Sequence, residues 1–241
     1  GRHFLADHDG DRLGLMSQGA ANVGGGMIIC EDIHKHYPLG HGRKNVLNGV
    51  NFTIQKGQKV GLLGRNGAGK STLIKLLGGV EFPSSGRIRR HMSLSWPLGF
   101  GGGFQGSLTG YDNARFIARI YGQDYDAIKD FVEDFTELGR QLKAPVKTYS
   151  SGMRARLAFA LSLIIEFDCY LIDEVILVGD QDFQRKCYHE LFEKRADRTL
   201  VIASHSPGTI QKYCNQALII HDGLGRFYDD VTEALDVYSA L

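Results

Sequence analysis

The segment with the most specific chemical spacing is GRNGAGKS, at residues 64–71. It fits the phosphate-binding loop (P-loop) pattern, follows an apolar run at residues 60–63 and precedes a helix-like run at residues 72–77. Glycines let backbone N–H groups curl around phosphate oxygens, and the helix start adds positive dipole. Lys70 would reach the β- and γ-phosphates, and Ser71 would ligate magnesium. The predicted phosphate-binding residues are Gly64, Arg65, Asn66, Gly67, Ala68, Gly69, Lys70, Ser71 and Thr72.

Two acidic residues end a later apolar run, at residues 169–172. A strand of this kind places Asp173 at the carboxyl edge of a parallel sheet, beside the P-loop. There Asp173 would hold magnesium, while Glu174 would orient and deprotonate the attacking water. The alternative is a strand that merely meets a turn at two solvated acids.

A histidine follows another apolar run, at residues 200–203. His205 is therefore expected at the same sheet edge as Asp173 and Lys70, where it could touch the γ-phosphate. The eight other histidines lack this position at a strand end and are interpreted as structural.

The elements that position these residues form an alternating pattern. Residues 60–63, 170–172 and 200–203 are short apolar runs, typical of strands buried on both faces of a parallel sheet, and helical stretches separate them. Strand patterns at residues 27–30 and 50–54 indicate a small β-rich start. Residues 113–121 and 125–138 have helical periodicity and indicate a helical insert. We therefore expect an α/β core.

The composition excludes several classes of protein. Basic and acidic residues number 28 and 27, so no strong field favours nucleic acid as a partner. No run approaches the roughly 18 apolar residues of a membrane span, which predicts a soluble, cytosolic chain. Residues 1–26 end in three glycines and indicate an extension or a segment left from cloning. Within them, residues 7–11 resemble the start of a calcium loop, but Gln18 stands where that loop needs glutamate.

Residues 149–154 (YSSGMR) precede a long apolar helical run and resemble the signature segment of ABC ATPases. In that family, backbone amides at this helix start bind the γ-phosphate of ATP held by a second subunit. The resemblance assigns this role to Ser150, Ser151 and Gly152. Tyr149, Ser151 and Met153 replace the usual Leu, Gly and Gln, and the two serines could also be an ordinary helix N-cap.

The order P-loop, signature, acidic strand end and histidine is that of the ABC ATPase family, and the resemblance covers residues 27 to about 221. It implies that Tyr37 stacks on adenine and that Asp180 occupies the D-loop acid position. Tyr37 could instead be a core or surface ring. Gln105 is the candidate Q-loop residue, which would contact magnesium and sense the membrane partner. A flexible Gly-rich lid without ligand contact is the alternative for Gln105.

Residues 173–180 (DEVILVGD) and 103–110 (GFQGSLTG) resemble capsular polysaccharide export ATPases. This resemblance implies ATP hydrolysis, bound ATP and Mg²⁺, a second copy of the chain and a polytopic membrane permease. It places the chain at the cytoplasmic face of the bacterial inner membrane and leaves further capsule export components open. Related O-antigen and teichoic acid exporters often append a carbohydrate-binding domain, whereas this chain ends about 36 residues past His205.

The resemblance also implies the domain organisation. We expect a P-loop ABC ATPase fold at residues 27–241, with a RecA-like parallel-sheet core, a small antiparallel β part and a helical signature subdomain at about residues 107–165. Alternatives for function are O-antigen or teichoic acid export, a non-transport mechanical ABC ATPase, and a P-loop kinase. A kinase would need no signature helix from a second chain, and monomeric, acceptor-dependent turnover would support it.

Overall fold

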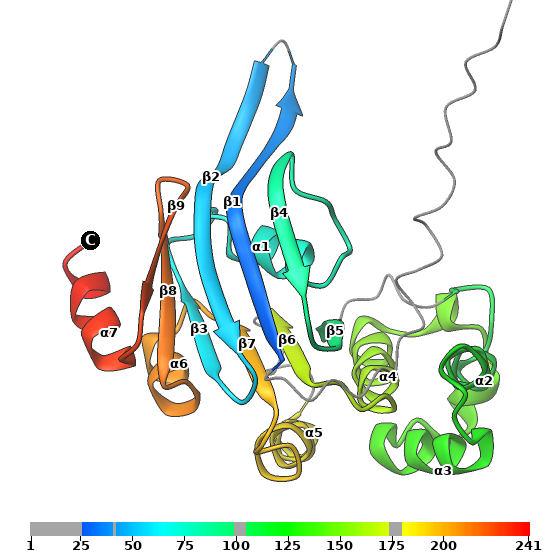
Figure 1. The fold of residues 1–241 in the computed structure, drawn as a ribbon. Helices are drawn as coiled ribbons and strands as arrows, with labels where there is room; N and C mark the ends of the chain where they lie inside the picture. Colours follow the sequence, from blue (N-terminus) through cyan, green and yellow to red (C-terminus); the bar gives the residue numbers. More distant parts are fainter. Residues whose placement is uncertain (1–25, 41, 99–104, 174–179) are drawn as a thin grey trace, which may run out of the picture.

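The computed structural model describes residues 26–40, 42–98, 105–173 and 180–241. Within them, one sheet has three strands in the order β2-β1-β4 and another has six in the order β5-β6-β7-β3-β8-β9 (Figure 1). The three-stranded sheet is antiparallel and consists of β1 (Met27–Leu39), β2 (Gly42–Gln55) and β4 (Ser85–Arg90). These strands extend the β-rich start that the sequence predicts at residues 27–30 and 50–54.

The six-stranded sheet contains the apolar runs that the sequence identifies as buried strands. They are β3 (Lys59–Leu63), β6 (Cys169–Asp173) and β7 (Thr199–Ala203), and they pair in parallel with one another and with β5 and β8. The other members are β5 (Leu94–Leu98), β8 (Gln216–His221) and β9 (Leu224–Tyr228), of which β9 runs antiparallel to β8. Pro97 lies on β5, and β5 is an edge strand, the position where a missing backbone donor costs least.

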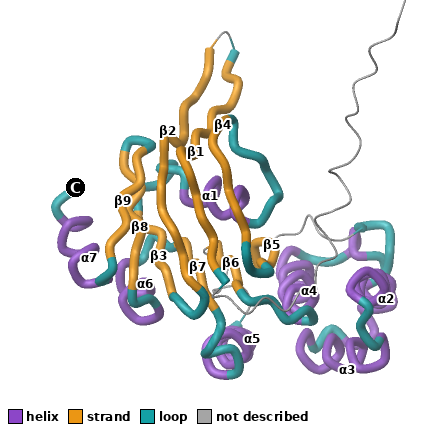
Figure 2. Tube along the Cα trace, viewed as in Figure 1, coloured by secondary structure: helices purple, strands orange, loops and turns teal. Residues whose placement is uncertain are grey.

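Side chains on the two faces of the six-stranded sheet pack into two different cores. Val60 and Leu62 of β3 face one core with the antiparallel sheet and α1 (Lys70–Leu77). Leu63 of β3 and Tyr170 of β6 face the other core, with the remaining helices. Figure 2 shows the outcome, with α1 enclosed among strands and the other helices at the periphery. Burial on both faces explains why these strands are continuous apolar runs.

A group of helices stands to one side of the sheets (Figure 1). It contains α2 (Gly110–Tyr121), α3 (Tyr125–Thr136), two 3₁₀ turns at Gly139–Lys143 and Val146–Thr148, and α4 (Ser151–Leu163). These elements fall within the span of about 107–165 expected for the helical insert. Thr109 caps α2 in a capping box with Asp112, which explains why that helix begins before the apolar periodicity does.

Further helices follow the acidic strand end. They are α5 (Gln181–Tyr188), a π-helical turn at His189–Glu193, α6 (Pro207–Tyr213) and α7 (Val231–Ser239). Among the described residues, no helix is both long enough and apolar enough to cross a membrane.

The helix α1 is tied to the antiparallel sheet at its carboxyl end. The guanidinium of Arg90, on β4, donates hydrogen bonds to the carbonyl oxygens of Leu76 (2.7 Å) and Leu77 (2.8 Å). Carbonyls in the last turn of a helix have no partner inside the helix, so a cation there satisfies them and complements the dipole.

Candidate functional site

The P-loop forms the turn between β3 and α1. Gly69 has φ 112°, a left-handed conformation that favours glycine. At Gly64 a Cβ atom would lie 2.7 Å from the carbonyl oxygen of Ile220, which is closer than any real contact of this kind. The glycine pattern is therefore required by the backbone path, and it brings the loop against β8.

Lys70 is the first residue of α1 and is buried, with 6% of the residue exposed. Its ammonium donates to the carbonyl oxygens of Gly64 (2.6 Å) and Arg65 (3.2 Å) across the loop. A buried cation is costly unless it is hydrogen-bonded, and here the loop supplies the acceptors. The ammonium is thus fixed inside the turn that would receive phosphates.

Ser71 and Asp173 meet at the carboxyl edge of the parallel sheet. Asp173 is the last residue of β6 and pairs with Ala203 of β7, which in turn pairs with Leu62 of β3. The hydroxyl of Ser71 donates to Oδ1 of Asp173 at 3.0 Å. A hydroxyl and a carboxylate side by side are oxygen ligands of the kind that Mg²⁺ takes together with waters and phosphate oxygens, so these residues fit that ion.

Of the predicted catalytic residues His205 and Glu174, the structure describes only the first. His205 follows the end of β7 by two residues and is exposed at the same carboxyl edge as Asp173. Glu174 falls in the segment 174–179, outside the described residues, so its proposed work on the attacking water stays a prediction.

A cavity of about 310 Å³ opens over the P-loop. Tyr37 lines it together with P-loop residues, as the resemblance to ABC ATPases implies. Burial, and then the hydrogen bond to Glu81, raise the pKa of Tyr37, so its phenol is neutral at physiological pH. The described residues that line this cavity are Tyr37, Lys44, Val46, Asn66, Gly67, Gly69, Lys70, Ser71 and Thr72.

Lys44 and Val46 belong to this cavity, although the sequence interpretation did not select them. Both lie on β2, which pairs with β1 so that Lys44 stands opposite Tyr37. The alternation of apolar and polar residues on β2 lies at residues 50–54, whereas Val46 and Leu47 are two adjacent buried residues. The sequence pattern around Val46 therefore did not indicate that it faces a cavity.

The signature residues lie outside the cavity lining. Ser150 is the N-cap of α4, and its hydroxyl accepts a hydrogen bond from the amide of Met153 at 3.2 Å. Ser150 and Ser151 are exposed and Gly152 is half-buried. The N-cap alternative is therefore realised, and it leaves this helix start facing solvent in the single chain.

Tyr149 is the first residue of the signature segment, and its surroundings show why a tyrosine is tolerated there. Its ring is buried, and its hydroxyl donates to the carbonyl oxygen of Gln141 at 2.7 Å. A phenol can fill an apolar site when its hydroxyl finds a partner. Arg154 donates to the carbonyl of Tyr149 at 2.6 Å and ties the first turn of α4 to the same segment.

Asp180 caps α5 and pairs with the signature helix. Its carboxylate accepts from the amide of Phe183 at 2.9 Å and lies 2.5 Å from the guanidinium of Arg156, on α4. The amide of Phe183 is the main cause that lowers the pKa of Asp180. The D-loop candidate is thus linked to α4 and lies outside the lining of the P-loop cavity.

Gln105 is exposed at the entrance to the helical insert. Its amide donates to Oδ1 of Asn113 at 2.8 Å, and Nδ2 of Asn113 donates to its carbonyl oxygen at 3.1 Å. Its main chain is therefore anchored, whereas Gln105 is outside the lining of the P-loop cavity. Residues 99–104, which precede it, lie outside the described residues.

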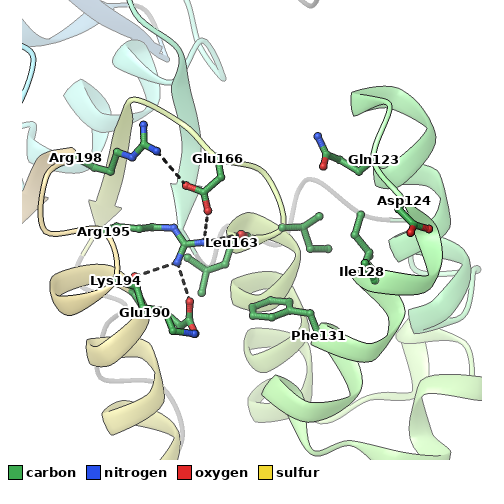
Figure 3. Close-up of a pocket in the computed structure, with 12 residues that line it drawn as sticks. Gln123, Asp124, Ile128, Phe131, Leu163, Glu166, Glu190, Lys194, Arg195 and Arg198 are labelled. Atoms are coloured by element: carbon green, nitrogen blue, oxygen red, sulfur yellow. Dashed lines mark hydrogen bonds and ion pairs between the residues drawn. The ribbon is translucent and has the colours of Figure 1, made fainter.

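A second cavity, of about 420 Å³, lies between α3, the end of α4 and the segment before β7 (Figure 3). Its charged centre is Arg195, which donates to Glu166 at 2.7 Å and to Glu190 at 2.8 Å. The same guanidinium also reaches the hydroxyl of Tyr170 and the carbonyl of Leu163. Because its donors are engaged within the protein, we interpret this cluster as a brace between the helical insert and the core.

Comparisons with known proteins define the class. The family model described as "ABC transporter" matches residues 47–176, and the chain belongs to this family. The ATP-binding protein BexA of Haemophilus influenzae is 56% identical over 88% of this chain and 98% of its own length.

A second relative is similarly close. The capsule polysaccharide export ATP-binding protein CtrD of Neisseria meningitidis serogroup B is 55% identical over 89% of this chain and 100% of its own length. Relatives named for O-antigen and teichoic acid export are less similar, at 39% identity or below.

The fold is also that of solved ABC cassettes. A dimeric structure of the cassette MJ0796, bound to ADP and Pi after hydrolysis, aligns with a TM-score of 0.68 at 18% identity, covering 83% of this chain and 97% of that one. The similarity supports the predicted α/β P-loop fold with parallel and antiparallel sheets.

Proposed function

We propose that this chain is the ATP-hydrolysing subunit of an ABC transporter that exports capsular polysaccharide through a separate permease. The observation that carries the site is the P-loop cavity, with Lys70 inside the turn and Ser71 against Asp173. The support for capsular polysaccharide is the 55% identity to the capsule polysaccharide export ATP-binding protein CtrD, over 100% of its length.

In this proposal each residue has a distinct task. Lys70 would pair with the β- and γ-phosphates, and the amides that open α1 would bind the same oxygens. Ser71 and Asp173 would hold Mg²⁺, which supplies charge neutralisation at the phosphates when bound. Glu174 would take the proton of the attacking water, and His205 would contact the γ-phosphate. Tyr37 would stack on adenine.

The other half of the site would come from a second copy. Ser150, Ser151 and Gly152 open an exposed helix start outside the cavity, so they can reach phosphates only from another chain. Two ATP molecules between two chains would favour a closed dimer, and hydrolysis would remove the contacts that hold it. The permease would convert this motion into export, with the chain held peripherally at the cytoplasmic face of the inner membrane.

The test is a pull-down from detergent-solubilised native membranes, with Glu174→Gln in magnesium-ATP as bait. Without its base this variant should bind ATP and remain a closed dimer, so it should retain the permease. We expect a polytopic membrane protein without an ATPase domain, encoded beside capsule genes, and Lys70→Ala as the control bait should recover much less of it.

Other outcomes point to the rivals. Recovery of only soluble partners would support a non-transport ABC ATPase. Recovery of a permease encoded among O-antigen or teichoic acid genes would change the polymer but keep the mechanism. Full ATP turnover by Glu174→Gln would contradict the role of that residue.

A further inference from the structure

The hydroxyl of Tyr37 is held by a carboxylate from another part of the chain. It donates to Oε2 of Glu81 at 2.6 Å, across a sequence separation of 44 residues. The ammonium of Lys35 lies 3.1 Å from the same oxygen, and that of Lys75 lies 3.5 Å from Oε1. Since Lys35 is on β1 and Lys75 is in the last turn of α1, Glu81 joins the strand that carries Tyr37 to the P-loop helix.

The cluster is shielded from solvent at Lys35 and Glu81, whereas the side chain of Lys75 is 38% exposed. The side chains of Lys35 and Glu81 are 13% and 24% exposed. Burial alone would raise the pKa of Glu81, but hydrogen bonds from Tyr37 and Lys35 and the charges of Lys35 and Lys75 hold it below its usual value. Glu81 is therefore an anion at neutral pH, and an ionised acceptor makes the bond from a phenol shorter and stronger.

Lys35 also covers one face of the Tyr37 ring. Its ammonium lies 4.9 Å from the ring centroid and donates to the carbonyl oxygen of Phe82 at 2.8 Å. A cation over an aromatic face is attracted by the ring, so this face is occupied. A base that stacks on this ring would therefore take the other face.

We propose that Glu81 is a positioning residue for the nucleotide base. By holding the hydroxyl of Tyr37 and keeping Lys35 on one face, it sets the plane of the ring before nucleotide arrives. Fixing a side chain in its bound orientation reduces the entropy lost on binding. The inference rests on the proposed adenine contact of Tyr37, and it concerns the base end of the nucleotide rather than the phosphates.

The experiment compares two ligands that share phosphates but differ in the base. The affinities of the purified full chain for magnesium-ATP and magnesium tripolyphosphate are measured by isothermal titration calorimetry. The variants are Glu81→Ala, Glu81→Gln, Tyr37→Phe and the double variant Glu81→Ala/Tyr37→Phe. Glu31→Ala is the matched control, because Glu31 makes an exposed ion pair with Arg89 at 3.0 Å on the same sheet. Thermal melting verifies that each variant is folded.

We expect Glu81→Ala to weaken ATP binding about fivefold and Tyr37→Phe about threefold, because a ring that is no longer held in place must be ordered when the base binds. Tripolyphosphate binding should be unchanged in both. The double variant should lose no more than the larger single loss, because the interaction through which both residues act on the ring, the hydrogen bond between Tyr37 and Glu81, is absent from either single variant. Glu81→Gln keeps an acceptor for the phenol and should restore ATP affinity to within about twofold. Glu31→Ala should change the affinity for neither ligand.

Three results would overturn the inference. Equal losses for ATP and tripolyphosphate in Glu81→Ala would mean that Glu81 acts through Lys75 and α1. Unchanged ATP affinity in Glu81→Ala, or additive losses of affinity in the double variant, would show that Glu81 does not act through the Tyr37 ring.

The variant Tyr37→Ala distinguishes a failure of the adenine contact from a failure of the positioning role. If it leaves the ratio of the two affinities unchanged, the adenine contact itself is wrong. If it lowers ATP binding alone while Glu81→Ala does not, only the positioning role fails.

Discussion

Two helices begin at positions predicted to bind phosphate, and their first turns are completed differently. At α1 the N-cap is Gly69, which offers no side chain to the helix amides. At α4 the N-cap is Ser150, whose hydroxyl already accepts the amide of Met153. The first start lies beside a lysine, a cavity and an acidic strand end, whereas the second is a finished helix terminus exposed to solvent. This difference supports the proposal that one half of the site is built within the chain and that a second copy brings the other half.

The largest expected effect is at the internal half. Lys70→Ala removes a buried ammonium that spans the loop, and with it the charge opposite the phosphates. We expect ATP affinity to fall about 100-fold, measured by calorimetry, since charge-assisted hydrogen bonds contribute about 1.5–3 kcal/mol each. Lys143→Ala, at an exposed lysine of the helical insert, is the control and should bind ATP normally. Normal binding by Lys70→Ala would contradict the P-loop assignment.

The next largest effect should be on ATP-dependent dimerisation and not on ATP binding by the monomer. Gly152→Asp places a carboxylate at the start of α4, where a Cβ meets no atom closer than 4.0 Å, so the chain should fold. Like charge against phosphate disfavours association. We expect monomeric ATP affinity to stay within about twofold while the ATP-dependent dimer of the Glu174→Gln background falls at least about tenfold, by analytical ultracentrifugation. An unchanged dimer would contradict a role for α4 in the second half of the site.

The cap residue of α1 should not tolerate a side chain. Gly69→Ala would force an alanine to φ 112° with its Cβ 3.0 Å from Cγ1 of Val46. We expect the free energy of unfolding to fall by about 2 kcal/mol in urea titrations, the cost of a strained backbone. A loss below about 0.5 kcal/mol would mean that the loop relaxes without cost.

Substitution of Ser150, the N-cap of α4, should have the smallest effect on stability. Ser150→Ala removes the acceptor for the Met153 amide, and such a loss costs about 1 kcal/mol of stability. Ser150→Asn retains an acceptor and should be close to wild type in the same urea titration. Monomeric ATP affinity should not change in either variant. If the monomer of Ser150→Ala bound ATP more weakly, Ser150 would belong to the half of the site that is built within the chain, and the contrast between the two helix starts would be wrong.

The internal half was predictable from the sequence because local rules determine it. The strand before the P-loop, β3, and the strand before Asp173, β6, lie in the same parallel sheet on either side of β7. Their carboxyl ends therefore share one edge of the sheet, and Ser71 comes to lie beside Asp173. The position of His205 follows from the same rule. The helical insert was predictable from its periodicity, although α3 ends at Thr136 rather than Leu138.

The remainder depends on contacts between distant segments. Lys44 and Val46 reach the cavity only because the ribbon of β1 and β2 lies over the P-loop, and no local pattern specifies that packing. The strand at residues 94–98 was not predicted from the sequence; it contains Pro97, which an edge position accommodates. The second half of the site could be proposed only from the resemblance to ABC ATPases, because Ser150 satisfies the rules for a cap and for a phosphate ligand equally well.

The bonds from Arg90 to the end of α1 have a mechanical consequence. With Glu81 also pairing Lys75 near that end and holding Tyr37 on β1, the P-loop helix and the antiparallel sheet are fastened at two separate points. The helix α1 and the antiparallel sheet should therefore move as one rigid body when nucleotide binds. The distance between the base contact at Tyr37 and the phosphate contacts of the P-loop should then stay constant. Amide hydrogen exchange in β1, β4 and α1 should accordingly slow together on nucleotide binding, as a single cooperative block.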